Sequence, residues 1–321
     1  MMYSTIKLSV IAPMFNEEAV IEAYLEKTLE ILNNHFQNYE LILIDDGSTD
    51  RTVSRCLSYI RENKRIRLIS FSRNYGHEIA STAGLETATG DLVILMDTDL
   101  QHPPELIPDM VAKASQGYDV VCALRTNRDE ESWFKKTTAK LFYGLSRKMT
   151  GFDLNADTGN FRLISRKVVD SLNKMKENNR HLIMMFAYVG YKTANISFHC
   201  PPRAAGKTKY NIRKLIKLSL DSIIGFSSRP LRLMSMFSVM ISIIMMVYAG
   251  FILIQKLFTH QQLADGMASI IFLISGLFSV LFLFLAIISE YISRILIETK
   301  NRPLYNIKQD ITYETISQLS E

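Results

Sequence analysis

Apolar residues in the first two-thirds of the chain fall into short continuous runs separated by longer stretches of helical period. Runs of strand length occur at 8–12, 41–44, 66–71, 92–96 and 120–124. Stretches with a helical spacing lie between and after them, at 17–36, 51–61, 77–88 and 104–115. This alternation predicts an α/β fold, a mostly parallel sheet with helices on both faces. Gly90 and Gly117 follow two of the predicted helices, where we expect a left-handed backbone conformation.

The last third of the chain has a different pattern, in which long uncharged blocks replace the periodic ones. No charged residue lies between Arg232 and Lys256, or between Asp265 and Glu290. At about 1.5 Å per residue, each block forms a helix of roughly 35 Å, which is enough to cross the ~30 Å hydrocarbon core of a bilayer. Buried helices of a soluble core rarely reach this length without a charge. We therefore predict two C-terminal transmembrane helices, at 231–257 and 267–292.

Positive residues are concentrated at the outer ends of the two blocks and are absent from the loop between them. Lys and Arg are absent from the loop 258–266, whereas they cluster before the first block and after the second. The positive-inside rule therefore places this loop outside the inner (cell) membrane and both chain ends, including the tail 293–321, in the cytoplasm. The apolar run before Pro13 is too short for a signal peptide, so residues 1–203 are expected to form a cytosolic domain.

The segment 204–230 joins the two parts and is both basic and amphipathic. On a helical wheel it separates an apolar face from a charged face, made respectively of Ile212, Leu215, Ile216, Leu220 and Ile223, and of Arg213, Lys214, Lys217 and Asp221. This pattern predicts an interfacial helix that lies in the headgroup plane with its cations toward anionic lipid. An ordinary amphipathic helix packed on the cytosolic domain is the alternative.

Composition and charge exclude several classes of protein. The 321 residues are 48% hydrophobic, and a net charge of +5 is too mild to indicate nucleic-acid binding. The three cysteines, Cys56, Cys122 and Cys200, show no Cys-x-x-Cys spacing, so we expect neither a disulfide nor a zinc site. No glycine-rich phosphate loop follows the first strand, which disfavours a P-loop NTPase or a dinucleotide dehydrogenase.

Polar residues follow three of the predicted strands, at 13–18, 45–50 and 97–104. In a parallel sheet, ligands bind at the carboxyl ends of the strands. Helix N-capping could explain such residues singly. It does not explain Asp97 and Asp99 together, because two carboxylates one residue apart repel each other unless a cation lies between them. With the amide of Gln101, these hard oxygen ligands suit Mg²⁺ or Mn²⁺, which typically also takes oxygens from a substrate diphosphate.

The segments 10–17, 45–50 and 97–104 resemble, in order and spacing, the family 2 glycosyltransferases of GT-A fold, which is Rossmann-like. Residues 157–162 and 203–210 narrow the resemblance to the group of dolichyl-phosphate mannose synthase and the polyisoprenyl-phosphate glycosyltransferases. Within that group the chain looks most similar to the GtrB-type bactoprenol glucosyltransferases. Met14 and Phe15 depart from the family pattern, which more often has Thr-Tyr there.

The resemblance implies a metal-dependent, inverting glycosyltransferase at the cytoplasmic membrane face. The expected donor is UDP-glucose and the expected acceptor is undecaprenyl phosphate; GDP-mannose with dolichyl phosphate is the alternative pair. A two-span transport or flippase accessory protein and an inactive sugar-nucleotide sensor are alternatives from other classes. A flippase and a downstream glycosyltransferase are the implied protein partners. Small residues at Gly250, Gly276 and Ala286 favour a homo-oligomer.

The resemblance also assigns roles to individual residues. The nucleotide-binding set is Pro13, Phe15, Asn16, Glu17, Asp45, Asp46 and Asp97. The metal ligands are Asp97, Asp99 and Gln101, with Asp99 counted as catalytic. The set for the acceptor phosphate is Arg125, Arg128, Arg162, Arg203, Lys207 and Lys209; a plain positive-inside flank is the alternative for Lys209. Asp157 is the candidate catalytic base. A phosphate monoester is largely dianionic near pH 7 and leaves a base little proton to remove, so an orienting carboxylate is the other role for Asp157. His77 and His102 are expected to be loop and cap residues.

Overall fold

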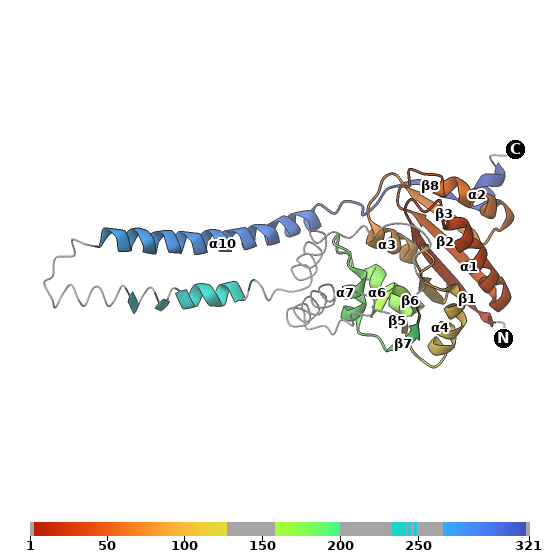
Figure 1. The fold of residues 1–321 in the computed structure, drawn as a ribbon, viewed down its shortest axis with the longest axis horizontal. Coiled ribbons are helices and arrows are strands. Elements are labelled where there is room, and N and C mark those ends of the chain that lie inside the picture. Colours follow the sequence, from red (N-terminus) through yellow and green to blue (C-terminus); the bar gives the residue numbers. More distant parts are fainter. Residues whose placement is uncertain are drawn as a thin grey trace.

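The structure, a computed structural model, describes residues 3–126, 158–199 and 266–318, together with parts of a helix between 231 and 248. The described residues form an α/β domain, from which a long helix extends away to one side (Figure 1). The chain returns to the domain after this helix, so that both described chain ends lie on it.

The described part of the chain contains one eight-stranded sheet, in the order β7-β5-β6-β4-β1-β2-β3-β8. Its strands are β1 Tyr3–Met14, β2 Phe36–Asp45, β3 Ile66–Phe71, β4 Leu92–Leu95, β5 Val120–Arg125, β6 Thr158–Ser165, β7 Thr193–Phe198 and β8 Ile307–Ile311. The strands β3, β2, β1 and β4 pair in parallel, as do β5 and β7. The strands β6 and β8 run antiparallel to their neighbours.

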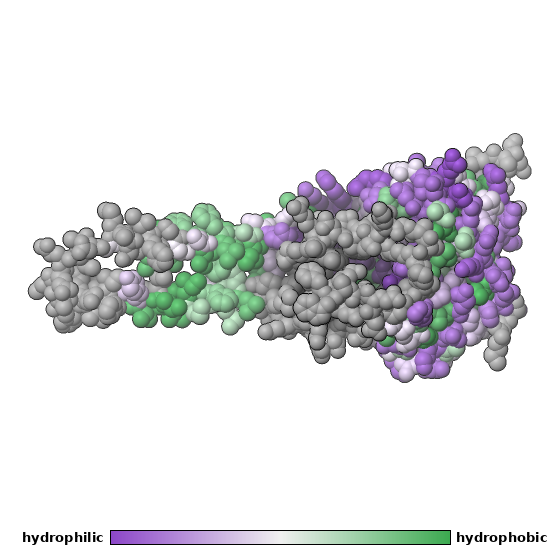
Figure 2. Space-filling model, in the orientation of Figure 1, coloured by the Kyte–Doolittle hydropathy of each residue, from purple (hydrophilic) through white to green (hydrophobic). Residues whose placement is uncertain are grey.

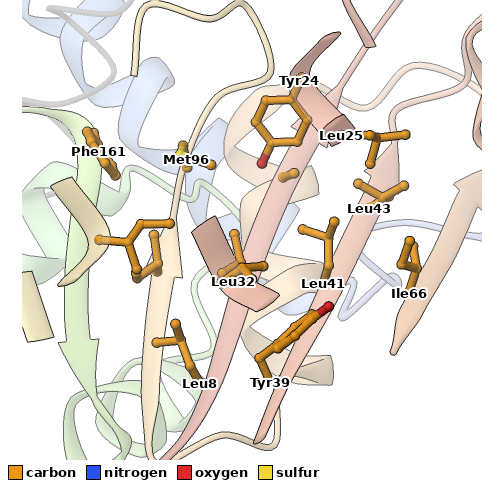
Figure 3. Packing of buried hydrophobic residues seen from close by; sticks show 14 of the residues in the cluster. Leu8, Tyr24, Leu25, Leu32, Tyr39, Leu41, Leu43, Ile66, Met96 and Phe161 are labelled. Atoms are coloured by element: carbon orange, nitrogen blue, oxygen red, sulfur yellow. The ribbon is translucent and has the colours of Figure 1, made fainter. Parts of the chain in front are cut away.

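Helices connect these strands, and those of the domain cover both faces of the sheet. They are α1 Ile21–His35, α2 Thr52–Glu62, α3 His77–Thr87, the 3-10 turn η1 Pro104–Leu106, α4 Ile107–Ala114, α6 Arg166–Lys174, α7 Leu182–Val189, α10 Met267–Thr299 and α11 Tyr313–Gln318. One core, partly drawn in Figure 3, packs α1, α2 and α4 on one face of the sheet. A second core packs α3, α6 and α7 on the opposite face. The predicted two-faced α/β architecture is thus confirmed.

The central strands show why both faces are apolar. In β1, Leu8, Val10 and Ala12 belong to the first core, whereas Ile11 belongs to the second. Successive side chains of a strand point to opposite faces, so a strand covered on both sides must be continuously apolar. The same rule applies to Leu41–Ile44 of β2, which the sequence pattern located correctly.

The sequence pattern missed the strands β6, β7 and β8. The sheet is mostly parallel as expected, but β6 and β8 pair antiparallel with their neighbours. In β6, polar Asn160 and Arg162 alternate with apolar Phe161 and Leu163, so no apolar run marks the strand. The strand β8 lies at the sheet edge with four of its five residues exposed. Neither strand therefore carries the continuous apolar signature of the central ones.

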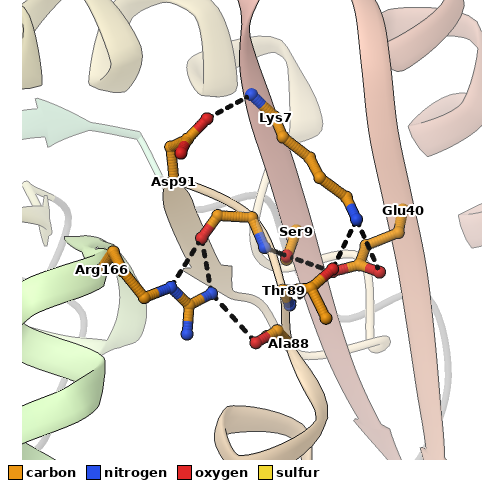
Figure 4. A network of polar contacts seen from close by, with 8 residues as sticks. Lys7, Ser9, Glu40, Ala88, Thr89, Asp91 and Arg166 are labelled. Carbon is orange, nitrogen blue, oxygen red and sulfur yellow. Dashed lines mark hydrogen bonds and ion pairs between the residues drawn. The ribbon is translucent and has the colours of Figure 1, made fainter.

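Polar contacts close the end of the sheet opposite to the carboxyl ends of its parallel strands (Figure 4). Glu40 accepts hydrogen bonds from Ser9 and Thr89, and Arg166 donates to the carbonyl oxygens of Ala88 and Gly90. The expectation for Gly90 is wrong, because its φ is not positive, whereas that of Gly117 is +86°. A Cβ atom at Gly90 would lie 2.6 Å from the Ser9 hydroxyl, so close approach of the backbone is what requires glycine there.

The helix α10 contains the second predicted membrane span. Its segment Gly276–Thr299 is the one described helix that is long and apolar enough to cross a membrane, and none of that segment is buried within the protein. Figure 2 shows the contrast between this apolar helix and the hydrophilic surface of the domain. The first predicted span, 231–257, lies largely outside the described residues and is not confirmed; its described residues are helical. The segment 204–230 also lies outside the described residues.

Candidate functional site

Three predicted polar segments meet at the carboxyl ends of the central parallel strands. The strands β1, β2 and β4 are parallel neighbours that end at Met14, Asp45 and Leu95, so the segments that follow them emerge side by side. The carboxyl ends of parallel strands are where ligands bind in open α/β sheets. The predicted site segments are therefore brought together by the topology, although they are far apart in the sequence.

The turn after β1 is interlocked with the turn after β2. Asn16, which has a positive φ of 54°, donates its backbone N–H to the Ser48 hydroxyl at 2.9 Å and accepts the Thr49 N–H on its Oδ1 at 2.8 Å. Asn tolerates this backbone conformation better than most residues. The N–H of Glu17 donates to the Thr52 hydroxyl at 2.8 Å. These bonds hold Asn16 at the surface, where its side chain is exposed.

Pro13 and Phe15, from the same predicted set, lie in less accessible positions. Pro13 is buried within β1, opposite Ile44 of β2, and Phe15 is half-buried. Proline has no N–H to give to the ladder, which matters less here because β1 ends one residue later. The turn after the strand, at Phe15 and Asn16, carries the exposed polar atoms.

The residues Asp45 and Asp46 are 1% and 3% exposed. Asp45 accepts the backbone N–H of Ser48 and the hydroxyl of Ser70. Asp46 accepts the backbone N–H groups of Tyr75 and Gly76, at 2.6 and 2.9 Å. Buried carboxylates need such donors to offset their desolvation. Both residues therefore organise the turns that surround the site, and Asp46 ties the loop after β3 to the end of β2.

Asp97 is the centre of a charged cluster after β4. Its Oδ1 lies 2.7 Å from Nε2 of His77, the first residue of α3, and its Oδ2 lies 3.8 Å from Nδ1 of His102. His102 is buried, stacks on the ring of Phe161 at 5.0 Å, and accepts the backbone N–H of Asp97 on Nδ1. Segments that follow β3 and β4 thus converge on one carboxylate.

Electrostatics in this cluster favour the ion pair. Burial opposes the protonation of His77, but the carboxylates of Asp97, Glu78 and Asp46 together raise the pKa of His77 to about 9, with Asp97 contributing most. Burial alone would raise the pKa of Asp97, yet the neighbouring His77 holds it well below its usual range. At neutral pH the pair is therefore imidazolium and carboxylate. Burial lowers the pKa of His102.

The chemistry of Asp97, Asp99 and Gln101 fits a hard divalent cation. Asp99 accepts the backbone N–H of Gln101 on Oδ1 at 3.1 Å, across the turn at Leu100, whose φ is +60°. Within the described ranges, no group of three or more His, Cys, Asp or Glu side chains is arranged to hold a metal. Two carboxylates and an amide supply oxygen ligands to a cation of this kind, which also takes waters and substrate phosphate oxygens.

Two of the predicted acceptor-phosphate cations, Arg125 and Arg162, lie in the described part of the chain. Arg125 ends β5 beside the Asp97 cluster, with Nη2 at 3.4 Å from His102 Nε2. Arg162 of β6 is 3% exposed, and its guanidinium lies 4.3 Å from the ring centroid of Phe186 in α7; burial lowers its pKa. The remaining predicted residues lie outside the described part of the chain: Arg128, Asp157, Arg203, Lys207 and Lys209.

His77 was expected to be a loop or cap residue, but it lies in direct contact with Asp97. Asn160 of β6 lies beside it, with Nδ2 at 3.5 Å from His77 Nδ1. The sequence offered one signal for His77: it follows the loop after the apolar strand β3, whose carboxyl end lies beside those of the other site strands. Asn160 lies in the segment 157–162 that narrowed the resemblance, but it was assigned no role and β6 itself was not predicted.

Comparisons with known proteins point to one family. Residues 9–172 match the family described as "Glycosyl transferase family 2". The chain is 41% identical over 310 residues to the Bacillus subtilis protein named "Uncharacterized glycosyltransferase YkcC", covering 96% of this chain and 95% of that protein. It is 35% identical over 303 residues to the "Bactoprenol glucosyl transferase" of Shigella phage SfII, covering 94% of this chain and 98% of that protein.

Among solved structures, the fold is similar to that of glucosyl-3-phosphoglycerate synthase from Mycobacterium tuberculosis in complex with Mn²⁺, UDP and phosphoglyceric acid. The TM-score is 0.52 at 20% identity, and the match covers 68% of this chain and 77% of that one. At this identity the likeness supports the fold.

Proposed function

The chain belongs to glycosyl transferase family 2, and on that premise we propose that it transfers glucose from UDP-glucose to a polyisoprenyl phosphate at the cytoplasmic face of a membrane. The observation that carries the proposal is that one chain combines a candidate donor and metal site with an apolar helix of membrane length. Asp97 and Asp99 follow a parallel strand at the ligand-binding edge, and the exposed apolar helix α10 follows the same domain. A relative named for glucosyl transfer to bactoprenol supports the acceptor class.

Residues on the ends of β1, β2 and β4 would bind the donor. Asn16 is exposed at the turn after β1, while Asp45 and Asp46 hold the neighbouring turns in place. Asp97, Asp99 and Gln101 would hold Mg²⁺ or Mn²⁺ against the donor diphosphate. When bound, such an ion neutralises the charge that develops on the departing UDP. His77 would keep Asp97 ionised and oriented, since it binds one carboxylate oxygen directly.

Arg125 would meet the phosphate of the acceptor, because its guanidinium ends β5 next to the Asp97 cluster. Arginine suits a phosphate that leaves water, since it pairs charge with two directed hydrogen bonds. A single displacement at the anomeric carbon, with the acceptor oxygen entering opposite to UDP, inverts an α-linked donor to a β-linked product. The acceptor phosphate is largely dianionic near pH 7, so little proton removal is needed.

The proposal is tested with purified protein, radiolabelled UDP-glucose, Mg²⁺ and polyprenyl phosphate. We expect label in the organic phase, and we expect Asp99→Ala to abolish it. Asp109→Ala is the matched control, since Asp109 is an exposed aspartate on α4 and belongs to none of the three polar segments. A parallel reaction with GDP-mannose tests the alternative donor. Absence of organic-soluble label with every nucleotide sugar would reject the enzyme and leave a transport accessory or a sensor.

Asp157 has a separate test. As a base or orienting carboxylate, it acts after the donor is bound, so Asp157→Asn is expected to lower turnover strongly while UDP binding survives. An equal loss of UDP affinity would assign Asp157 to the donor site.

A further inference from the structure

The helix α10 is longer than a bilayer core. Its 33 residues, at about 1.5 Å each, measure roughly 50 Å, against ~30 Å of hydrocarbon. The uncharged part, 267–289, accounts for about 35 Å of this length. The remaining residues begin at Glu290, which pairs with Arg294 one turn later at 3.0 Å. The last ten residues of the helix therefore extend beyond the hydrocarbon on the side of the catalytic domain.

The end of α10 is bound to that domain through Glu298. Its carboxylate accepts the backbone N–H of Asn178 on both oxygens, at 2.9 and 3.0 Å, and the side-chain amide of Asn178 at 2.8 Å. Asn178 lies in the loop between α6 and α7. Two donor groups on one carboxylate, the N–H and the side-chain amide of Asn178, orient the helix end as well as attach it.

The chain after α10 crosses the domain and enters the sheet. Together with the last two residues of α10 it forms the segment 298–311, which we call the C-terminal strap. Tyr305 stacks on Phe71 with ring centroids 4.8 Å apart and donates its hydroxyl to Glu86 at 2.7 Å. Asn306 accepts the backbone N–H of Ser72 and donates its amide to the Tyr75 hydroxyl, both at 2.9 Å.

The strap then ends in β8, which pairs antiparallel with β3. Within this pair, Arg67 donates two hydrogen bonds to Asp310, at 2.9 and 2.6 Å. A paired strand and a bidentate ion pair hold the strap at a defined register on the domain. The segment is therefore a structural part of the catalytic domain, although it follows the membrane helix in sequence.

The strap contacts the same two segments that build the site. Tyr75 bonds Asn306 through its hydroxyl and Asp46 through its N–H. The helix α3 bonds Tyr305 through Glu86 and Asp97 through His77 at its opposite end. One loop and one helix thus connect the end of the membrane helix directly to the candidate metal and nucleotide residues.

We propose that the C-terminal strap is a positioning element that holds the site at a set height and orientation above the bilayer. The inference rests on the proposed function, because it assumes a lipid acceptor whose phosphate is confined to the headgroup plane. Such a phosphate reaches the site only in one relative placement, so loss of that placement lowers its effective concentration. An acceptor dissolved in water approaches from any direction and does not depend on the strap.

The test uses full-length protein in vesicles of one lipid composition, with two acceptors. One is a long-chain polyprenyl phosphate in the bilayer, and the other is a short-chain, water-soluble prenyl phosphate in the buffer. The variants are Glu298→Ala, Tyr305→Ala and their combination. The matched control is Glu290→Ala, which removes a carboxylate from the same helix whose partner, Arg294, is on that helix too.

For the combined variant we expect kcat/KM with the bilayer acceptor to fall about tenfold or more, and that with the soluble acceptor to stay within about twofold. KM for UDP-glucose and the activity of Glu290→Ala should be unchanged. If Tyr305→Ala does not fold, Tyr305→Phe keeps the ring stack, loses the Glu86 bond and carries the same test.

Equal losses with both acceptors would overturn the positioning role in favour of a purely structural one. Unchanged transfer to the bilayer acceptor, or an equal loss in Glu290→Ala, would overturn it as well. A wild-type protein that glycosylates neither acceptor would reject the proposed function and the strap's role with it, and that result is distinct from the others.

Discussion

Asp46 and Gly47 lie where the turn after β2 meets the loop after β3. Asp46 receives two backbone N–H groups from that loop, and Gly47 adopts a φ of +72° against its backbone. A Cβ atom on Gly47 would lie 2.5 Å from the carbonyl carbon of Arg73. Close approach of two turns thus depends on one carboxylate and one missing side chain.

Gly47→Ala is expected to cost more stability than Gly117→Ala. Both positions have a positive φ, so each pays about 1 kcal/mol for alanine in that conformation. A Cβ on Gly117 meets nothing within 4 Å, whereas one on Gly47 displaces the backbone of Arg73 and Asn74, which adds about 1–3 kcal/mol. Thermal unfolding in detergent measures the difference. Equal shifts in Tm would contradict the steric argument.

Asp46→Asn tests the carboxylate. The amide group of Asn would face one of the two N–H donors and leave it without an acceptor, at a cost of about 1–3 kcal/mol. Asp91→Asn is the control, because Asp91 is exposed and accepts the Lys7 N–H on one oxygen, which an amide oxygen can replace. Unfolding experiments on both variants check the prediction, and a result in which Asp91→Asn is the more destabilised would refute it.

The helix α3 shows how one element serves packing and site together. His77 begins it at the site, Glu86 near its end binds the strap, and Ala80, Ala83 and Leu85 pack in the second core. Gly84 lets the helix approach β1, since a Cβ there would lie 2.2 Å from Cγ2 of Ile11. The small residues of α3 therefore set the distance between the helix and the sheet, and hence the place of His77.

Gly84→Ala and Ile11→Ala are expected to be non-additive. Alone, the first overpacks the contact by about 1–3 kcal/mol, and the second leaves a cavity that costs about 2–5 kcal/mol. Together, the new methyl group enters the space that Ile11 vacates, so the double variant should be more stable than the sum predicts by about 1 kcal/mol. Denaturation of the four proteins in the cycle measures this coupling, and strict additivity would contradict the contact.

At the scale of the whole molecule, a hydrophilic domain carries a helix with its apolar surface uncovered (Figure 2). No residue in the membrane-length segment of α10 is buried in the protein. Its exposed side chains include Phe282 and Leu283, and Val247 is an exposed residue of the described helix before it. Exposed apolar surface of this extent needs lipid or another apolar partner.

We therefore expect the protein to sediment with membranes and to be released by detergent. High salt and alkaline carbonate release proteins held by surface charge, whereas burial of an apolar helix contributes about 25 cal/mol per Å² and is not reversed by salt. Fractionation followed by extraction under the three conditions measures this. Release by salt alone would contradict a membrane-embedded α10.

The sequence by itself determined the central strands, the helices between them and the polar segments after β1, β2 and β4. Apolar period and turn chemistry are local properties, so they are present in any short window of the chain. The uncharged block of α10 is also a local feature, and the sequence located it but predicted that the helix ends at 292. In the structure the helix continues to Thr299, and the pair of Glu290 and Arg294 lies in this extension beyond the apolar block.

Only the tertiary structure decided which of these segments touch. The strand β8 is mostly exposed, and it begins 236 residues after the end of its partner β3, so no local pattern could assign it. His77 binds Asp97 because α3 begins beside the end of β4, and Asp46 holds Tyr75 for a similar reason. Such contacts form only when distant strands pair in the sheet, so no short window of the sequence contains the information for them.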